Sequence, residues 1–141
     1  MDSIDEQLIL ALKENGRAST AQLARIVGRS RTSVQSRIER LERQGIIVGY
    51  AVRLAPEHDE GAVRAHVMIK VGAKEARAVT AALRGIPQVR VLHSVSGEVD
   101  LIAVAVTPSV AEMDQAIDRI GALEGVERTT SSIILSTKFE R

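Results

Sequence analysis

The chain has 141 residues, room for one ordinary domain or two small ones, which excludes a large multidomain enzyme. Apolar residues make up 45% and charged residues 26%, a composition typical of folded globular proteins. The 19 basic and 18 acidic side chains leave a net charge of +1, so a charged partner must be attracted by local charge placement. Cysteine is absent, and the polar N-terminus is unlike a signal peptide. We therefore expect a cytoplasmic protein without disulfides or membrane-spanning segments.

The first 28 residues predict two short helices. Apolar residues recur at helical spacing over residues 4–12, and Ser3 and Glu6 are expected to form the capping box of the first helix. The second helix should begin after Ser19, with Gln22 completing its capping box. Gly28 can adopt the left-handed conformation that ends a helix. This pattern indicates two helices joined by a tight connection.

A third, longer helix is predicted from Ser30, its cap, to Gly45. It is amphipathic, with an apolar stripe on one face and arginine, serine and amide side chains on the other. The β-branched residues 46–54 follow, and we expect them to form a short hairpin turned at Gly49. This hairpin would be the wing of a winged helix-turn-helix unit.

The rest of the chain alternates between two periodicities. A polar run containing Pro56 marks a linker over residues 54–62, between an N-terminal domain of residues 1–53 and a C-terminal domain of residues 63–141. Strands and helices are predicted in the order βαββαβ over residues 63–71, 74–83, 89–96, 99–107, 109–123 and 126–137. The expected fold class is α+β, with a winged helix-turn-helix followed by a ferredoxin-like βαββαβ sandwich. Because the strands carry apolar groups on both faces, the open sheet face should drive self-association.

Positive charge is concentrated between Arg17 and Arg43. Seven arginines and two glutamates give this stretch a charge of +5. Two short helices followed by a longer one with an arginine-rich face are typical of a helix-turn-helix unit, whose second helix enters the major groove of DNA. A guanidinium forms paired hydrogen bonds with phosphate or guanine, and the amide of Gln35 can pair with adenine.

The candidate DNA-contacting residues share the start and the polar face of the third helix. They are Arg29, Ser30, Arg31, Thr32, Ser33, Gln35, Ser36, Arg37 and Arg40. Arg37 has an alternative role, since it could pair with an acidic residue of the first helix and support the fold. Another class of function also stays open, because a basic helix can be a solvated face and three helices can bind a partner protein in a metabolite-binding or assembly module.

The N-terminal third resembles the signature of the Lrp/AsnC family of bacterial and archaeal regulators. The matching elements are Asp5 and Leu10, Asn15-Gly16-Arg17, Leu23-Ala24, the turn at residues 28–33, Arg37, Leu41-Glu42 and Gly45-Ile46-Ile47. The βαββαβ half is similar to the ligand-sensing domain of that family, so the resemblance covers essentially the whole chain. It implies a transcription regulator that binds double-stranded DNA as a homodimer, often assembles into an octamer, and responds to a small molecule, commonly an amino acid.

The same resemblance suggests an effector site. In the family this site lies between dimers and is marked by a Gly-Asp-Tyr-Asp-like turn, which corresponds here to Gly97, Glu98, Val99 and Asp100. Val99 and Glu98 depart from the family pattern, which puts the identity of the ligand in question. Backbone N–H groups of such a turn could bind a carboxylate and Asp100 an ammonium group. A second wall is expected from Thr129, Thr130, Ser131 and Ser132. Alternatively, residues 97–98 are only a hairpin turn and residues 129–132 only the surface of a strand.

Catalytic functions have little support. His58, His66 and His93 are too dispersed for a metal-binding motif, and no glycine-rich phosphate loop is present. RNA-binding sheets of this class stack bases on aromatic side chains, but residues 63–138 contain no Phe, Tyr or Trp. We expect neither an enzyme nor a metal or other cofactor.

Overall fold

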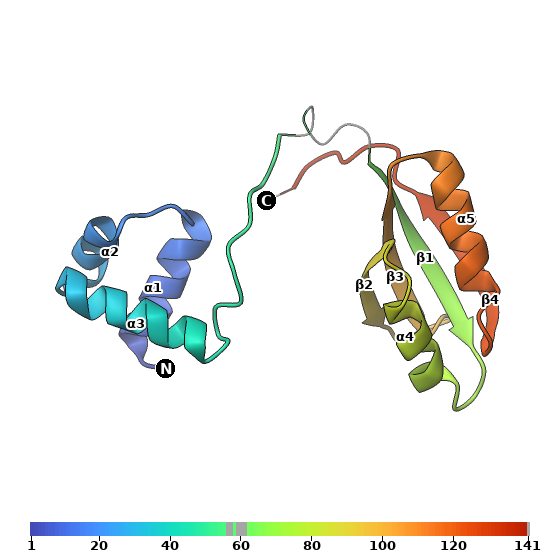
Figure 1. The fold of residues 1–141 in the computed structure, drawn as a ribbon, viewed down its shortest axis with the longest axis horizontal. Coiled ribbons are helices and arrows are strands. Elements are labelled where there is room, and N and C mark those ends of the chain that lie inside the picture. The colour runs from blue at the N-terminus through green and yellow to red at the C-terminus, as the bar shows by residue number, and fades with distance from the viewer. Residues whose placement is uncertain (56–57, 59–61, 141) are drawn as a thin grey trace. The chain divides into compact units, whose positions relative to one another are not determined.

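The computed structural model describes residues 1–55, 58 and 62–140, and its ribbon is drawn in Figure 1. The chain divides into two compact units, Met1–Leu54 and Ala55–Arg141. The first contains helices, and the second contains a four-stranded sheet and two helices, which confirms the α+β class. No helix in the described ranges is long and apolar enough to cross a membrane.

The first unit contains the three predicted helices. They are α1 (Ser3–Glu14), α2 (Thr20–Val27) and α3 (Arg31–Arg43). The capping box of α2 is confirmed, because Ser19 Oγ accepts from Gln22 N at 3.1 Å and Gln22 Oε1 accepts from Ser19 N at 2.8 Å. Gly28 ends α2 in the left-handed region with φ of 63°, as predicted. Both ends of the connection from α2 to α3 are therefore set by local sequence.

The capping box predicted for α1 is wrong by one residue. Asp2, not Ser3, is the cap, and its Oδ1 accepts from the backbone N–H groups of Ile4 and Asp5 at 3.0 Å each. Asp5, not Glu6, completes the box by accepting from Asp2 N at 3.0 Å. Asp5 is also needed in the interior of the unit, as described below, and this long-range requirement selects the register.

The predicted wing is not formed. Residues 46–55 contain no strand, which corrects the expectation of a hairpin turned at Gly49. Val48 and Val52 are 94% and 84% exposed, so the β-branched side chains pack against nothing that would hold two strands together. A two-stranded hairpin without a packed face is only marginally stable in water, which explains why strand propensity alone fails here.

The second unit follows the predicted order. Its elements are β1 (Val63–Val71), α4 (Ala76–Arg84), β2 (Val89–Ser94), β3 (Leu101–Thr107), α5 (Val110–Gly121) and β4 (Val126–Ile133). The strands form one antiparallel sheet in the order β2-β3-β1-β4, the arrangement expected of a ferredoxin-like sandwich. The bounds of β1 match the prediction, whereas β4 ends at Ile133 and not at residue 137.

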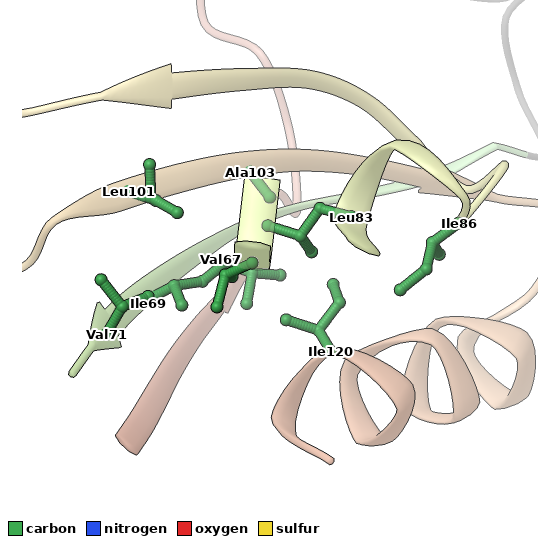
Figure 2. Packing of buried hydrophobic residues seen from close by; sticks show 9 residues of the cluster. Val67, Ile69, Val71, Leu83, Ile86, Leu101, Ala103 and Ile120 are labelled. Carbon is green, nitrogen blue, oxygen red and sulfur yellow. The ribbon is translucent and has the colours of Figure 1, made fainter. Parts of the chain in front are cut away.

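One face of this sheet carries the core. Alternate residues of β1 and β3, including Val67, Ile69 and Ala103, are 0% exposed beneath α4 and α5. Leu83 of α4 and Ile120 of α5 point into the same cluster in Figure 2. Strand alternation therefore directs every second side chain into one apolar layer.

The opposite sheet face is left open by α4 and α5. The register places Val104 and Ile102 of β3 beside His66 and Met68 of β1 on this face. Its β2–β3 half is mostly apolar, with Val91 44% exposed, and also carries the exposed His93. Its β1–β4 half is polar, since β4 contributes Arg128, Thr130 and Ser132 at the positions that pair with Lys70, Met68 and His66. The expected apolar patch thus lies on the β2–β3 side of the open face.

Candidate nucleic-acid interface

The faces of α3 are set by its helical spacing. Val34 and Leu41 are 0% exposed and pack into the first unit. Val34 shares that interior with Leu8 of α1 and with Leu23 and Val27 of α2. The side chains on the outer face of α3 are exposed; they are Arg31, Thr32, Gln35, Ser36, Glu39, Glu42 and Arg43. The helix therefore presents a continuous polar surface to solvent, anchored from behind by its apolar stripe.

The start of α3 combines a cap with a concentration of cations. Ser30 Oγ accepts from Ser33 N at 3.2 Å, which confirms the predicted cap. An open hollow of about 770 Å³ lies at the connection between α2 and α3, and it is lined by Ala21, Ala24, Arg25, Gly28, Arg29, Ser30 and Arg31. Three arginines, Arg25, Arg29 and Arg31, line this hollow, next to the N-terminus of α3. Such an arrangement attracts anionic groups, phosphates among them.

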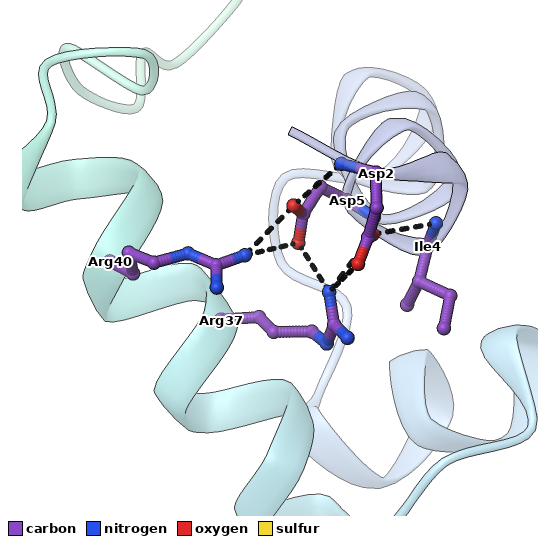
Figure 3. A network of polar contacts seen from close by, with 5 residues as sticks. All are labelled: Asp2, Ile4, Asp5, Arg37 and Arg40. Atoms are coloured by element: carbon purple, nitrogen blue, oxygen red, sulfur yellow. Dashed lines mark hydrogen bonds and ion pairs between the residues drawn. The ribbon is translucent and has the colours of Figure 1, made fainter.

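Two of the predicted DNA-contacting arginines form ion pairs at the start of α1. Figure 3 shows Arg37 and Arg40 of α3 directed at the start of α1. Arg37 Nη1 lies 2.7 Å from Asp2 Oδ2 and 2.9 Å from Asp5 Oδ1. Arg40 Nη2 lies 2.8 Å from Asp5 Oδ2. The alternative role proposed for Arg37 is thereby observed, and Arg40 shares it.

Asp5 is the centre of this network. Its side chain is 1% exposed, and a buried carboxylate is stable only when its charge and its lone pairs are matched. Burial by itself raises the pKa of Asp5, but the backbone N–H of Asp2 and the guanidinium groups of Arg37 and Arg40 outweigh burial, and its pKa is lowered. Hydrogen bonding to Arg37 is the largest cause that lowers the pKa of Asp2 from 3.8 to about 2. Both carboxylates are therefore charged at neutral pH.

The network reduces the positive charge that α3 presents to solvent. Ion pairing with Asp2 and Asp5 occupies two of the seven arginines between residues 17 and 43. The outer face of α3 then carries two arginines and two glutamates, so it is balanced in charge and not strongly basic. The positive charge lies mainly at the hollow beside the helix start.

Sequence reasoning missed three features of this region. Arg25 lines the hollow although it belongs to α2. Glu39 lies on the outer face of α3, which the 3.6-residue period could have indicated, since it is four residues after Gln35. The pairing of Arg40 with Asp5 had no local signal, because 35 residues separate the two.

In the predicted effector turn, Asp100 makes contacts that stabilise the fold. Residues 97–100 connect β2 to β3, and Asp100 is tied to the end of β1: its Oδ2 accepts from Val71 N at 3.0 Å and lies 3.7 Å from Lys70 Nζ. The Asp100 backbone N–H also donates to Ile69 O at 3.0 Å. Asp100 thus has a structural role, although its side chain stays 38% exposed.

The second predicted wall is not brought to that turn within one chain. Thr130 and Ser132 of β4 lie on the open sheet face, whereas Thr129 and Ser131 pair with Ile69 and Val67 and face the helices. The turn adjoins β3, and β1 separates β3 from β4. Strands two places apart are roughly 10 Å apart, so the two groups of residues are not in direct contact in a single protomer.

Both units match family models. An AsnC-type helix-turn-helix domain matches residues 1–42, and an Lrp/AsnC ligand binding domain matches residues 64–141. The chain is similar to the HTH-type transcriptional regulator LrpA of Mycobacterium tuberculosis, with 34% identity over 140 residues that cover 99% of this chain and 93% of the relative. It is also similar to the HTH-type transcriptional regulator FL11 of Pyrococcus horikoshii, with 27% identity over the same shares of the two chains.

A solved structure agrees with this relationship over the whole chain. The structure of a transcriptional regulator of Neisseria meningitidis in complex with L-Met aligns with a TM-score of 0.81 and 28% identity, covering 99% of this chain and 93% of that one. The helical unit, the sheet topology and the family matches therefore all indicate the same family. The chain belongs to the Lrp/AsnC family of transcriptional regulators.

Proposed function

We propose that this protein regulates transcription by reading a DNA duplex with the outer face of α3. Residues 1–53 form the DNA-binding domain, residues 54–62 the linker, and residues 63–141 the domain for ligand sensing and oligomerisation. The observation that carries the proposal is the exposed outer face of α3, with Arg31, Thr32, Gln35 and Ser36 directed away from the apolar core. This face has the polar groups that recognise base edges in the major groove.

Phosphate binding is assigned to the hollow beside α3. Arg25, Arg29 and Arg31 line it, and Ser30 places the N-terminus of the helix there. Contacts of this kind fix the register and orientation of the protein on the duplex but carry no sequence information. In this proposal the hollow supplies mainly affinity and the outer face mainly specificity, with Arg31 belonging to both.

Arg37 and Arg40 act as positioning residues. Their bonds to Asp2 and Asp5 hold the side of α3 against α1 and fix the direction in which the outer face points. They leave the set of direct DNA contacts, which becomes Arg29, Ser30, Arg31, Thr32, Ser33, Gln35 and Ser36.

The protein is proposed to act as a homodimer. A two-fold pairing of the open sheet faces buries Val91, Ile102, Val104 and Val106, which one protomer leaves partly exposed. Two-fold symmetry then predicts a pseudo-palindromic operator, with half-sites spaced by whole turns of the duplex. An octamer of four dimers is the further assembly that we propose from the family.

An amino acid is the proposed effector. The L-Met bound to the regulator of Neisseria meningitidis supports this class of ligand. Because residues 97–100 and 129–132 are apart within one protomer, a pocket formed by both requires a second protomer. In this proposal the chain is a cytoplasmic regulator without catalytic activity.

The DNA proposal is tested with Gln35→Ala. A pool of random duplexes selected with the wild-type protein gives the preferred site, and binding of the variant is then measured against that site and its single-base variants. We expect discrimination at one base pair to fall by about 1–3 kcal/mol, with other positions unchanged. If the variant keeps every base preference, or if wild-type binding does not respond to salt as phosphate neutralisation requires, α3 is not the reading element and binding of a partner protein becomes the better account.

A further inference from the structure

Glu39 lies in the middle of the outer face of α3. It lies four positions after Gln35, so the two side chains are neighbours on the helix surface. Its carboxylate is exposed and, among the described residues, forms no ion pair with an arginine of α3; Arg37 and Arg40 are directed at Asp2 and Asp5. An acidic group at the centre of a surface that faces phosphates lowers affinity, so its position calls for a compensating role.

One hydrogen bond ties Glu39 to the amide of Gln35, and a second ties that amide to α2. Gln35 Nε2 donates to Glu39 Oε1 at 3.0 Å, and Thr20 Oγ1 of α2 donates to Gln35 Oε1 at 3.5 Å. The amide is therefore held between two partners, with its oxygen toward α2 and its nitrogen toward Glu39. Both side chains are exposed, so the second N–H of the amide and the second oxygen of the carboxylate are accessible to an approaching duplex.

We propose that Glu39 is a specificity-determining residue, which accepts a hydrogen bond from the exocyclic amino group of a cytosine and orients Gln35 for the neighbouring base. A carboxylate accepts and cannot donate, so in the major groove it matches the N4 amino group of cytosine and opposes the O6 and N7 acceptors of guanine. The inference rests on the proposed role of α3, and it deepens that role by naming the base chemistry that the helix selects.

The position of Glu39 on the outer face also lowers the affinity for DNA in general. Glu39 opposes the approach of every duplex, because phosphates surround the major groove, whereas it favours only a duplex with an amino group at the right base. The carboxylate thereby lowers the affinity for non-specific duplexes and raises the ratio of specific to non-specific binding. Arg25, Arg29 and Arg31 at the hollow supply the general attraction that offsets this cost.

The test compares Glu39→Gln with Glu42→Gln. Glu42 is exposed on the same helix, where its Oε1 accepts from Tyr50 Oη at 2.9 Å, so the control makes the same change in charge about one turn farther from the helix start. Binding of each variant is measured against the selected wild-type site, its single-base variants and an unrelated duplex. Far-ultraviolet circular dichroism verifies that both variants fold.

We expect both variants to bind the unrelated duplex somewhat more tightly than the wild type does. Only Glu39→Gln should relax the choice of base, with discrimination between cytosine and guanine at one position reduced by about 5- to 150-fold. Glu39→Asp, with a shorter carboxylate, should retain the charge and lose part of the discrimination.

Two results would overturn the inference. One is that Glu39→Gln keeps the base preferences of the wild type while Gln35→Ala loses one, in which case α3 reads DNA without Glu39. The other is that Glu39→Gln and Glu42→Gln relax the same positions equally, in which case only the charge of the helix matters. Failure of the proposed function is distinct, because then Gln35→Ala would also leave every preference unchanged.

Discussion

The two units of this chain are stabilised in different ways, although each has only a small interior. The helical unit buries a few aliphatic side chains, Leu8, Leu23 and Val34 among them, and it adds an ionic network around the buried Asp5. The sheet unit relies on an apolar layer beneath α4 and α5 and leaves its other face open. The first unit thus depends on charge to fix the direction of α3, whereas the second depends on packing. This difference gives distinct ways to break each unit.

The largest expected effect is that of Asp5→Asn. Removing this charge leaves Arg37 and Arg40 without their common partner, and breaking a buried ion pair costs about 3 kcal/mol. Hydrogen exchange of the α1–α3 amides should report that loss, while the β1 and β3 amides should be unaffected. Glu6→Gln, an exposed change one residue away, is the control and should alter the free energy by less than about 0.5 kcal/mol. Equal protection in Asp5→Asn and wild type would refute the role of the network.

The sheet unit should be most sensitive at Gly125. This glycine has φ of 93°, and an added Cβ would lie 3.0 Å from Glu75 Cβ and from Val79 Cγ2. Gly125→Ala therefore combines backbone strain with overpacking against α4, and we expect a loss of about 2 kcal/mol in the sheet unit alone. Gly121→Ala is the matched control, because its Cβ would meet only Thr129 Oγ1 at 3.8 Å. Thermal unfolding that ranks the two variants equally would contradict this account.

Acid should destabilise the helical unit more than the sheet unit, with a smaller effect than the substitutions above. The folded-state pKa of Asp2 is about 2, below its ordinary 3.8, and the pKa of Asp5 is also lowered. Unfolding raises both pKa values, so the unfolded chain binds more protons in this window, and the stabilisation present above about pH 4 is lost as the pH falls toward 2. Titration followed by amide protection should show α1 and α3 opening first. The Asp5→Asn variant should lose the part of this dependence that comes from Asp5 and keep the part that comes from Asp2 and Arg37. Earlier opening of the sheet would contradict the assignment.

The smallest effect is expected at the turn before α3. Gly28 has φ of 63° with open space around its missing side chain, so Gly28→Ala should cost only the backbone term of about 1 kcal/mol. Gly16→Ala, in the same unit and with no positive φ, is the control. Urea midpoints of the two variants provide the comparison, and a neutral Gly28→Ala would mean that the turn is not held in the left-handed conformation.

Local patterns predicted much of the fold. The Ser19–Gln22 box, the Gly28 turn and the bounds of β1 each depend on residues adjacent in sequence, and all three are confirmed. The wing at residues 46–54 failed because strand propensity does not supply a partner strand. The inward direction of Arg40 could not be predicted, since its long side chain lies at the border of two faces and its partner is distant in sequence.

The central claim is that the arginines of α3 have two different roles: Arg31 contacts DNA, whereas Arg37 and Arg40 hold the helix against α1. The salt dependence of duplex affinity tests it directly when Arg31→Ala is compared with Arg37→Ala, at a temperature where both are folded. We predict that Arg31→Ala lowers the slope of log affinity against log salt by about one, while Arg37→Ala keeps the wild-type slope and lowers the stability of the helical unit. A reduced slope in Arg37→Ala together with an unchanged slope in Arg31→Ala would contradict the account.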